Sequence, residues 1–468
     1  GGSVNAATLK SASTNFAIKV GQSVASGTSS LGSNTTLNNT GGFLMGAAGN
    51  AHTLSVSGSF ATAATGTAKL NGGVTTTTIQ TYAAAVELTG DTTFTTTNSA
   101  VVFSSTVNGT TTNTESLTVA AGTGDVTFSA AVGGTTSLAN ISVTGAAITA
   151  AAVKADSAIS VTNSAASTIS GVISGDASFT KAGSGSLTLS GANTYLGATA
   201  VNAGSLLAAN TSGTSIHNSS AVTVASGATL DLRYSETLGS LAGAGTVTVG
   251  SAGAKTLTVG SLNSDTTFSG VLQDGSGSLL LTKSGTGTFT LTGANTYTGA
   301  TVISAGSLVF ERNAPSITTS GFSGAGSLVI QSAGSAFTSA YTFSATTSSL
   351  GGLTLGKSGS TANVTLTAAQ SVAGPVRIYG ANIAINAALT ATGSNTIWLY
   401  GSGTVNGSGA ITADKLALMS GAVSLTNASN NIGTLAADGV SSLSYVDSDA
   451  LTVGVVNPTG ISATGAVR

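Results

Sequence analysis

Apolar and polar residues alternate along most of this chain in short runs separated by glycine-centred turns. The segments VTVASGATLDLRY (222–234), GSGSLTLSGANTY (183–195) and GTGTFTLTGANTY (285–297) all have this form. Alternation with a period of two, punctuated by Gly, Asn and Ser, is typical of strands and tight turns. No stretch of ten or more residues has capped i, i+3, i+4, i+7 apolar spacing. The pattern therefore predicts an all-β protein with strands of about 4–6 residues.

A longer repeat lies on top of this alternation. The stretch GANTYLGATAVNAGSLLA (191–208) recurs as GANTYTGATVISAGSLVF (293–310), and the match extends upstream to Lys181 and Lys283. Further upstream, ISGVISGD and FSGVLQDG match with three residues inserted between the blocks. Repeats that tolerate small insertions indicate stacked units, each of which buries its apolar face against its neighbours. We therefore expect a parallel β-helix, a β-solenoid, with about 20 residues in each coil.

Such a solenoid gives the repeated residues structural roles. We expect Val, Leu, Ile and Ala to fill the interior, with Leu206 among them, and Ser and Thr to face outward. Gly191 and Gly197 are expected at corners, and Asn193 and Tyr195 along an edge. The same roles fall on the other repeat positions, which are Gly204, Gly293, Asn295, Tyr297, Gly299 and Gly306.

Composition divides the chain loosely into three segments. Residues 1–165 form a Thr- and Ala-rich solenoid segment, residues 166–312 contain the two clear repeats, and residues 313–468 are richer in bulky residues. One continuous solenoid can run through all three.

The low charge excludes several classes of function. Charged residues make up 6% of the chain and the net charge is −2, against about 25% charged residues in typical soluble proteins. We therefore expect no nucleic-acid partner. The absence of cysteine excludes disulfides and thiolate chemistry, and it suits a chain exported unfolded through an oxidising compartment. The chain opens with GGSVNAATLK, so we expect a processed, mature product.

Few residues offer catalytic or ligand-binding chemistry. We interpret His52 and His217 as exposed turn histidines, because no G-x-S-x-G motif accompanies them. Asp231, Arg233 and Glu236 are the candidates for polysaccharide chemistry, which needs paired carboxylates. We expect no catalytic residue and no cofactor, with one open alternative. Asp447 and Asp449, in an alternating strand, would face the same side and could bind Ca²⁺, or they flank a turn and stay solvated.

Aromatic residues leave further alternatives open. Tyr195 and Tyr297 could be platforms for sugars, or they could cover the coil edge or stack within the solenoid. Trp398 and Tyr400 form the bulkiest local patch, which suits a contact between subunits, a carbohydrate platform or an end cap.

The stretch from Ser240 to Phe310 resembles the passenger-associated transport repeat of bacterial autotransporters. Both copies have its Gly-x-Gly, LTL and GxNTYTGxT elements, except that the first has Leu196 where the second has Thr298, and the second has Phe289 at the first position of LTL. The segment 374–454 resembles the repeats of filamentous-haemagglutinin-like surface proteins. These resemblances imply a right-handed, single-stranded parallel β-helix, an outer-membrane translocator as partner, and display on the surface of a Gram-negative cell. The closing NPTGISATGAVR contains no strand of a membrane barrel, so a cleaved barrel, a larger parent protein or another export route is expected.

Three functions fit these observations. The first is a non-enzymatic extracellular structural protein that self-associates into a homopolymer, as a filament, sheath or surface layer, because a charge-poor surface favours association. The second is an adhesin that binds a cell-surface or glycan ligand. The third is a polysaccharide-active β-helix enzyme, which would release sugar from its substrate.

Overall fold

The computed structural model describes residues 18–20, 27–37, 42–46, 50–62, 65–313 and 317–468. These residues form strands and turns and no helix, so none of them could cross a membrane as a helix. The chain divides into two compact units, an N-terminal unit of residues 1–239 and a C-terminal unit of residues 240–468. The boundary between the units falls inside the segment 166–312, and the three segments drawn from composition stay a prediction.

The strands of the N-terminal unit belong to two sheets. The first contains β1 (Ile18–Val20), β2 (Gly27–Leu31), β4 (Phe43–Met45), β5 (His52–Val56), β7 (Ala68–Thr76), β9 (Val86–Thr96), β11 (Val107–Gly109), β12 (Leu117–Ala120), β14 (Leu138–Gly145), β16 (Val153–Asn163), β18 (Ile173–Ser174), β19 (Ser178–Ala182), β21 (Thr199–Val201), β23 (Ala221–Val224) and β25 (Glu236–Leu238). The second contains β3 (Thr35–Leu37), β6 (Phe60–Thr62), β8 (Gln80–Tyr82), β10 (Val101–Phe103), β13 (Val126–Phe128), β15 (Ile148–Ala150), β17 (Ser167–Ile169), β20 (Ser186–Leu189), β22 (Ser205–Ala208) and β24 (Thr229–Leu232).

The C-terminal unit is built in the same way. Most of its strands share one sheet, namely β26 (Ser240–Gly243), β28 (Lys255–Val259), β29 (Thr266–Phe268), β31 (Leu279–Lys283), β32 (Thr288–Leu291), β33 (Thr301–Ile303), β34 (Ser307–Glu311), β35 (Gly321–Ser323), β36 (Ser327–Gln331), β38 (Thr346–Leu350), β39 (Gly352–Leu355), β41 (Gln370–Val372), β42 (Val376–Gly380), β44 (Leu389–Ala391), β45 (Thr396–Gly401), β47 (Ile411–Met419), β49 (Asn431–Val440), β51 (Thr452–Val453) and β52 (Ile461–Ala463). The others are the pair β27 (Thr246–Val249) and β30 (Val271–Leu272), and the row β37 (Tyr341–Phe343), β40 (Val364–Leu366), β43 (Ile383–Ile385), β46 (Thr404–Asn406), β48 (Ala422–Leu425) and β50 (Ser442–Tyr445).

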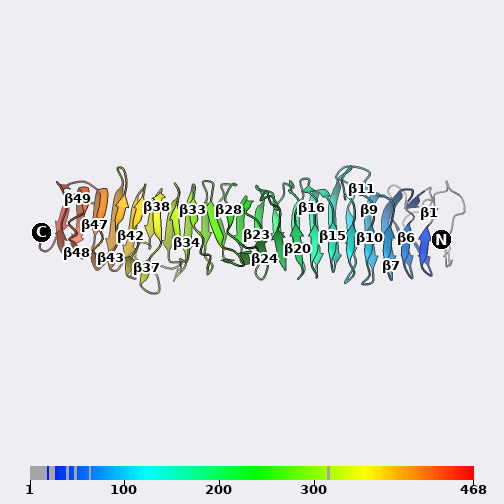
Figure 1. The fold of residues 1–468 in the computed structure, drawn as a ribbon, viewed down its shortest axis with the longest axis horizontal. Helices are drawn as coiled ribbons and strands as arrows, with labels where there is room; N and C mark the ends of the chain where they lie inside the picture. The colour runs from blue at the N-terminus through cyan, green and yellow to red at the C-terminus, as the bar shows by residue number, and fades with distance from the viewer. Residues whose placement is uncertain (1–17, 21–26, 38–41, 47–49, 63–64, 314–316) are drawn as a thin grey trace. The chain divides into compact units, whose positions relative to one another are not determined.

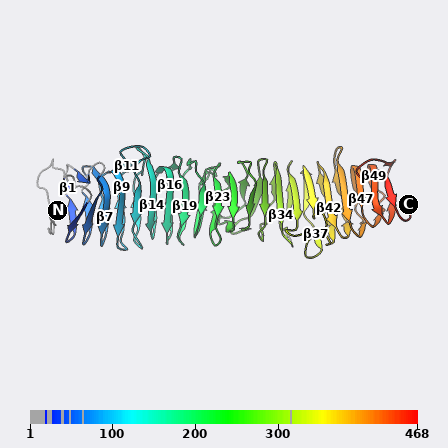
Figure 2. The same ribbon diagram turned by 180° about the vertical axis from the view of Figure 1, so that it is seen from behind.

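Within each unit, a strand pairs in parallel with its counterpart one coil away. Phe43 pairs with Ala68, Ala68 with Val86, and Val86 with Val107, so a coil contains about 20 residues. Successive strands follow one another in chain order in the views from both sides (Figures 1 and 2). The parallel β-solenoid that the alternation and the repeats predict is confirmed.

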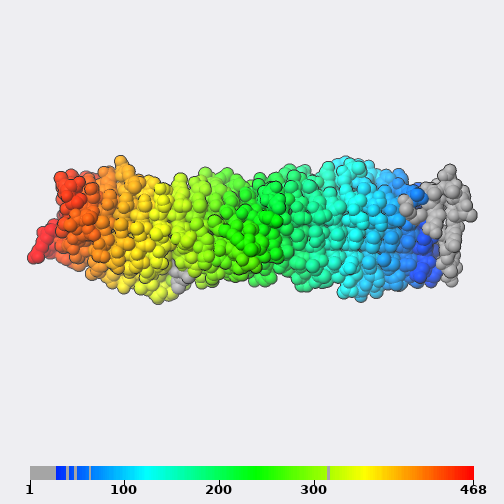
Figure 3. All heavy atoms as spheres, in the orientation of Figure 1, coloured from blue at the N-terminus to red at the C-terminus, as the bar shows by residue number. Residues whose placement is uncertain are grey.

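Alternation places one set of side chains inside each coil. The strands β5 and β42 show strict alternation of buried and partly exposed residues, and the interior of the N-terminal unit contains a column of aromatic rings. Its centroids lie 4.9–5.8 Å apart, close to the spacing of about 4.8 Å between strands, and its members are Phe43, Phe60, Tyr82, Phe103 and Phe128. The two stacked pairs, Tyr82–Phe103 and Phe103–Phe128, each contribute roughly 0.5–1.5 kcal/mol beyond the burial of their area. On the face that Figure 3 presents, the atoms of neighbouring coils within each unit lie against one another.

Candidate functional site

The Asn and Tyr of the first repeat lie inside the solenoid. The amide of Asn193 accepts a hydrogen bond from the backbone N–H of Ile173 at 2.7 Å and donates one to the carbonyl of Ser215 at 2.6 Å. Asn193 therefore joins its own coil to the coils before and after it. The Tyr195 ring is fully buried, and its hydroxyl lies 2.6 Å from the Thr199 hydroxyl. The expectation that these residues line an edge was wrong, because burial requires polar partners and both residues have them. Asn193 finds its partners in the adjacent coils, and Tyr195 finds Thr199 in its own coil.

The second repeat has a similar internal arrangement, except that the amide of Asn295 donates to the carbonyl of Gly293 in its own coil, at 3.1 Å. Asn295 accepts from the backbone N–H of Leu272 at 2.8 Å, and the hydroxyl of Tyr297 lies 2.8 Å from that of Thr301. Tyr195 and Tyr297 are 0% and 1% exposed, and burial raises the pKa of both hydroxyls well above its usual value. Neither ring is accessible as a platform for a sugar.

A buried lysine accompanies each repeat. The Nζ of Lys181 donates to the carbonyls of Ala182 and Gly183 at 2.8 Å and to that of Ala203, one coil further on, at 3.0 Å. The Nζ of Lys283 makes the three equivalent bonds, at 2.6, 2.8 and 3.3 Å. Burial lowers the pKa of Lys181 to about 8 and lowers that of Lys283 as well. The repeat match in the sequence includes both lysines, but we assigned them no role from the sequence. A lysine repeated at an inward position of a charge-poor chain was a signal that could have indicated a structural role.

The repeated glycines allow close approach of successive coils. A Cβ at Gly191 would overlap the carbonyl oxygen of Gly171, and one at Gly197 would lie 2.5 Å from that of Ala177. Gly204 and Gly306 also have positive φ values, of 65° and 63°. The corners thus need glycine for space as well as for conformation.

The carboxylates near the end of the N-terminal unit serve its structure. Asp231 forms an ion pair with Arg233 at 2.9 Å. Glu236 is buried and its Oε1 accepts from the backbone N–H of Ile216 at 3.0 Å. Burial, the largest cause, raises the pKa of Glu236 from 4.5 to about 7. Each carboxylate is thus engaged with a different partner.

Glu236 predicts a pH dependence of stability. Because its pKa in the folded chain lies above its pKa when unfolded, the folded state binds more protons between pH 4.5 and 7. The stabilisation is fully present below pH 4.5 and is lost as the pH rises through 7, for a total of about 3 kcal/mol. Hydrogen exchange of residues 205–239 in the full chain measures this loss. Glu236→Gln should flatten the profile, whereas Glu87→Gln, at a partly exposed site of the same unit, should leave it unchanged; an unchanged profile in Glu236→Gln contradicts the assignment.

The two histidines differ from each other. His52 was expected in an exposed turn, but it lies in β5, is buried, and contacts the Ser29 hydroxyl through Nε2 at 3.0 Å. This expectation was wrong because the adjacent strand supplies a polar partner. His217 is half-buried in the turn before β23, and its carbonyl accepts from the N–H of Ser220 at 2.7 Å.

The Ca²⁺ alternative placed Asp447 and Asp449 in an alternating strand. In the structure both follow the end of β50 and lie outside the strand. Asp447 already accepts from the hydroxyl of Tyr445 at 2.6 Å and from the N–H of Asp449 at 3.3 Å. Among the residues that the structure describes, no three His, Cys, Asp or Glu side chains gather in a group suited to a metal ion.

An exposed patch of a different kind lies on β42, β45 and β47 of the C-terminal unit. Parallel register pairs Arg377 with Trp398, and Tyr379 with Tyr400. The guanidinium of Arg377 lies 4.5 Å from the centroid of the Trp398 ring, and the two tyrosine rings stack at 4.4 Å with an angle of 6° between their planes. We call these four residues the aromatic ladder. All four are partly exposed because they occupy outward positions of their strands.

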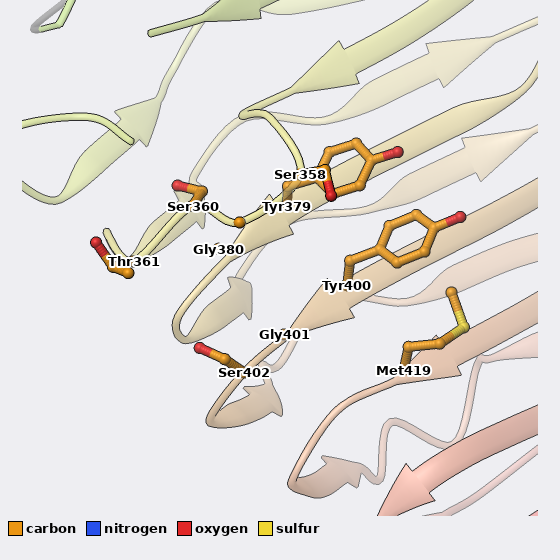
Figure 4. Close-up of a pocket in the computed structure, with 10 residues that line it drawn as sticks. Ser358, Ser360, Thr361, Tyr379, Gly380, Tyr400, Gly401, Ser402 and Met419 are labelled. Atoms are coloured by element: carbon orange, nitrogen blue, oxygen red, sulfur yellow. The ribbon is translucent and has the colours of Figure 1, made fainter. Parts of the chain in front are cut away.

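The tyrosine end of the aromatic ladder opens into a groove of about 430 Å³. Figure 4 shows the rings of Tyr379 and Tyr400 side by side on neighbouring strands, with Met419 beyond Tyr400. The turn from Ser358 to Thr361 also lines the groove. Burial, followed by the neighbouring Tyr379, raises the pKa of Tyr400. The sequence identified Trp398 and Tyr400 as a patch, but it could not place Arg377 and Tyr379 beside them.

The other side of the ladder is covered by the chain itself. Ala417 pairs with Trp398 in the next coil, and Ala436 pairs with Ala417 in the coil after that. Both alanines are buried and form a cluster with Val456. Trp398 and Met419 pack against this small cluster.

The parallel coils define a β-solenoid, and the repeated Lys, Asn and Tyr side chains are hydrogen-bonded inside it. Residues 179–208 and 281–310 each match the Passenger-associated-transport-repeat family. The chain thus contains the repeats of autotransporter passengers, and the resemblance drawn from its sequence is confirmed for these residues. Comparison with curated proteins and with solved structures gave no match. The likeness of residues 374–454 to haemagglutinin repeats stays a prediction.

Proposed function

We propose that the chain is a non-enzymatic structural protein, displayed outside a Gram-negative cell, that self-associates into a filament, sheath or surface layer. The transport repeats support an autotransporter passenger. Membership of that class implies secretion to the outer cell surface and association with an outer-membrane translocator domain.

The observation that carries the structural role is the use made of the repeated polar side chains. In both repeats the Lys, Asn and Tyr side chains are buried and bond to groups of their own and neighbouring coils. A motif repeated for catalysis or binding would present such groups to solvent. Here the conserved pattern between the copies is used to join coils, which suits a scaffold.

Self-association is supported by the scarcity of charge. With 6% charged residues and a net charge of −2, like-charge repulsion between copies is weak. The outward positions are Ser and Thr in strands such as β20 and β32. Neutral hydroxyl surfaces can meet without burying unpaired charges.

Purified full-length chain tests this proposal. Sedimentation velocity over a range of concentrations should show growth into large species, and electron microscopy of the same samples should show ordered assemblies. A monodisperse monomer at every concentration would contradict self-association. Release of sugar from polysaccharides, abolished by Asp231→Ala, would contradict the non-enzymatic role.

An adhesin is the second candidate, favoured by one observation. The groove beside Tyr379 and Tyr400 is an exposed, partly aromatic site that the buried repeats do not account for. A monomer that binds cells through this groove would support the adhesin over the structural polymer.

A further inference from the structure

We propose that the groove beside Tyr379 and Tyr400 binds a neutral saccharide. This inference goes beyond the structural role and does not depend on self-association. It rests on a free aromatic face, a lining of hydroxyl groups, and the absence of charged side chains from the lining.

The free aromatic face results from a glycine in the preceding coil. Leu355 pairs with Ile378, so Gly356 reaches the position beside Tyr379. A Cβ at Gly356 would lie 3.2 Å from the Cβ of Tyr379 and would overlap its carbonyl oxygen. The strand before Tyr379 therefore presents no side chain there, and the Tyr379 ring stacks on Tyr400 in the coil that follows. The chain then turns through Ser358–Thr361, which lines the groove, with Ser358 beside Tyr379 (Figure 4).

A sugar ring has the surface that this face fits. One side of a pyranose carries C–H groups of slight positive character, and an aromatic face is negative because of its quadrupole. The stacked tyrosines present a rigid apolar surface whose hydroxyl ends remain polar, so that they contact the C–H groups and the rim hydroxyls of a sugar. The volume of about 430 Å³ lies within the range of about 300–1,000 Å³ of small-molecule sites.

The remaining lining selects a neutral, polyhydroxylated ligand. Ser358, Thr361 and Ser402 are exposed and line the groove together with backbone at glycines. Hydroxyl and backbone groups both donate and accept, as a sugar hydroxyl does. No Asp, Glu, Lys or Arg is among the lining residues, and the guanidinium of Arg377 lies over Trp398. An anionic ligand would find no paired charge in this lining.

The only tryptophan of the chain reports on this site. Trp398 precedes Tyr400 by two residues on the same outward face of β45, so a ligand on the tyrosines changes its surroundings. The full-length chain is titrated with maltohexaose, cellohexaose, N-acetylchitohexaose and mannohexaose, and with hexagalacturonate as the charged probe, while Trp398 emission is recorded. At least one neutral hexasaccharide should give a saturable change.

Variants locate the binding. Tyr379→Ala should weaken the affinity about tenfold or more, and Ser358→Phe, at an exposed residue, should block the groove without removing a buried group. Tyr234→Ala is the matched control, because Tyr234 is an exposed tyrosine of the N-terminal unit, and it should change the affinity by less than about twofold. Circular dichroism checks that each variant folds. If Tyr379→Ala does not fold, Ser358→Phe still tests the groove.

Three results would overturn the proposal. They are binding of hexagalacturonate alone, no response to any neutral hexasaccharide up to its solubility limit, and equal affinity in Tyr379→Ala, Ser358→Phe and the parent chain. If Tyr379→Ala abolishes self-association and no sugar binds, the groove is a contact between copies instead. A monomeric chain that binds a neutral hexasaccharide keeps this proposal and contradicts only the polymer.

Discussion

Replacing Lys181 by methionine is expected to lower the free energy of local unfolding around residues 179–208 by about 3 kcal/mol. Methionine has a similar length and fills the same interior space, but it cannot donate to the carbonyls of Ala182, Gly183 and Ala203. Buried acceptors left without a partner each cost about 1–3 kcal/mol. The cost of burying the ammonium, visible in the lowered pKa of Lys181, offsets part of this loss.

Hydrogen exchange of the full chain, read over residues 179–208, measures the effect of Lys181→Met. Lys283→Met should produce an equal loss around residues 281–310, because Lys283 makes the equivalent bonds. Lys357→Met is the control, since Lys357 is exposed, and its effect should stay within about 0.5 kcal/mol. A neutral or stabilising Lys181→Met would mean that burial of the charge outweighs its hydrogen bonds.

Replacing Gly204 by alanine is expected to destabilise the same coils by about 3–5 kcal/mol. A Cβ at Gly204 would overlap the carbonyl oxygen of Gly185 in the preceding coil and would lie 2.6 Å from that of Gly183. The positive φ of 65° adds a conformational cost of about 1–2 kcal/mol. Since close-packed interiors do not yield to such overlap, the backbones of two coils must move apart.

Gly227→Ala separates the two contributions. Gly227 has a φ of 80°, and no atom lies within 4 Å of its added Cβ. Gly227→Ala should therefore destabilise the folded chain only by the conformational cost of about 1–2 kcal/mol. Denaturant unfolding of the full chain, supported by hydrogen exchange, compares both variants. Equal losses of unfolding free energy in Gly204→Ala and Gly227→Ala would contradict the claim that the close approach of the coils requires glycine at position 204.

The solenoid could be predicted from the sequence because it rests on alternation. Leu187 and Leu206 occupy inward positions in the same register, and the alternating pattern around them defines a buried face. Apolar burial needs no specific partner, so a local pattern is sufficient to predict it.

The polar interior could not be predicted in the same way. Asn193 and Lys181 are buried although they are polar, because backbone groups of adjacent coils meet their polar atoms. Those groups lie about 20 residues away, at distances that vary from coil to coil through insertions. His52 was misjudged for the same reason, since its partner Ser29 lies in the preceding coil.

The groove shows a similar limit. The patch of Trp398 and Tyr400 was visible in the sequence as adjacent bulky residues. Its neighbours Arg377 and Tyr379 are 21 residues upstream, outside the clear repeats, and only the parallel register places them beside it. The bare position at Gly356 depends on that register too.

Immunogold electron microscopy of intact cells that express the chain tests the central claim most directly. The account predicts label on the outer face of the cell, over a continuous layer, sheath or filament that is absent from a deletion strain. Label confined to the cell interior, or scattered over isolated molecules with no ordered structure, would contradict it.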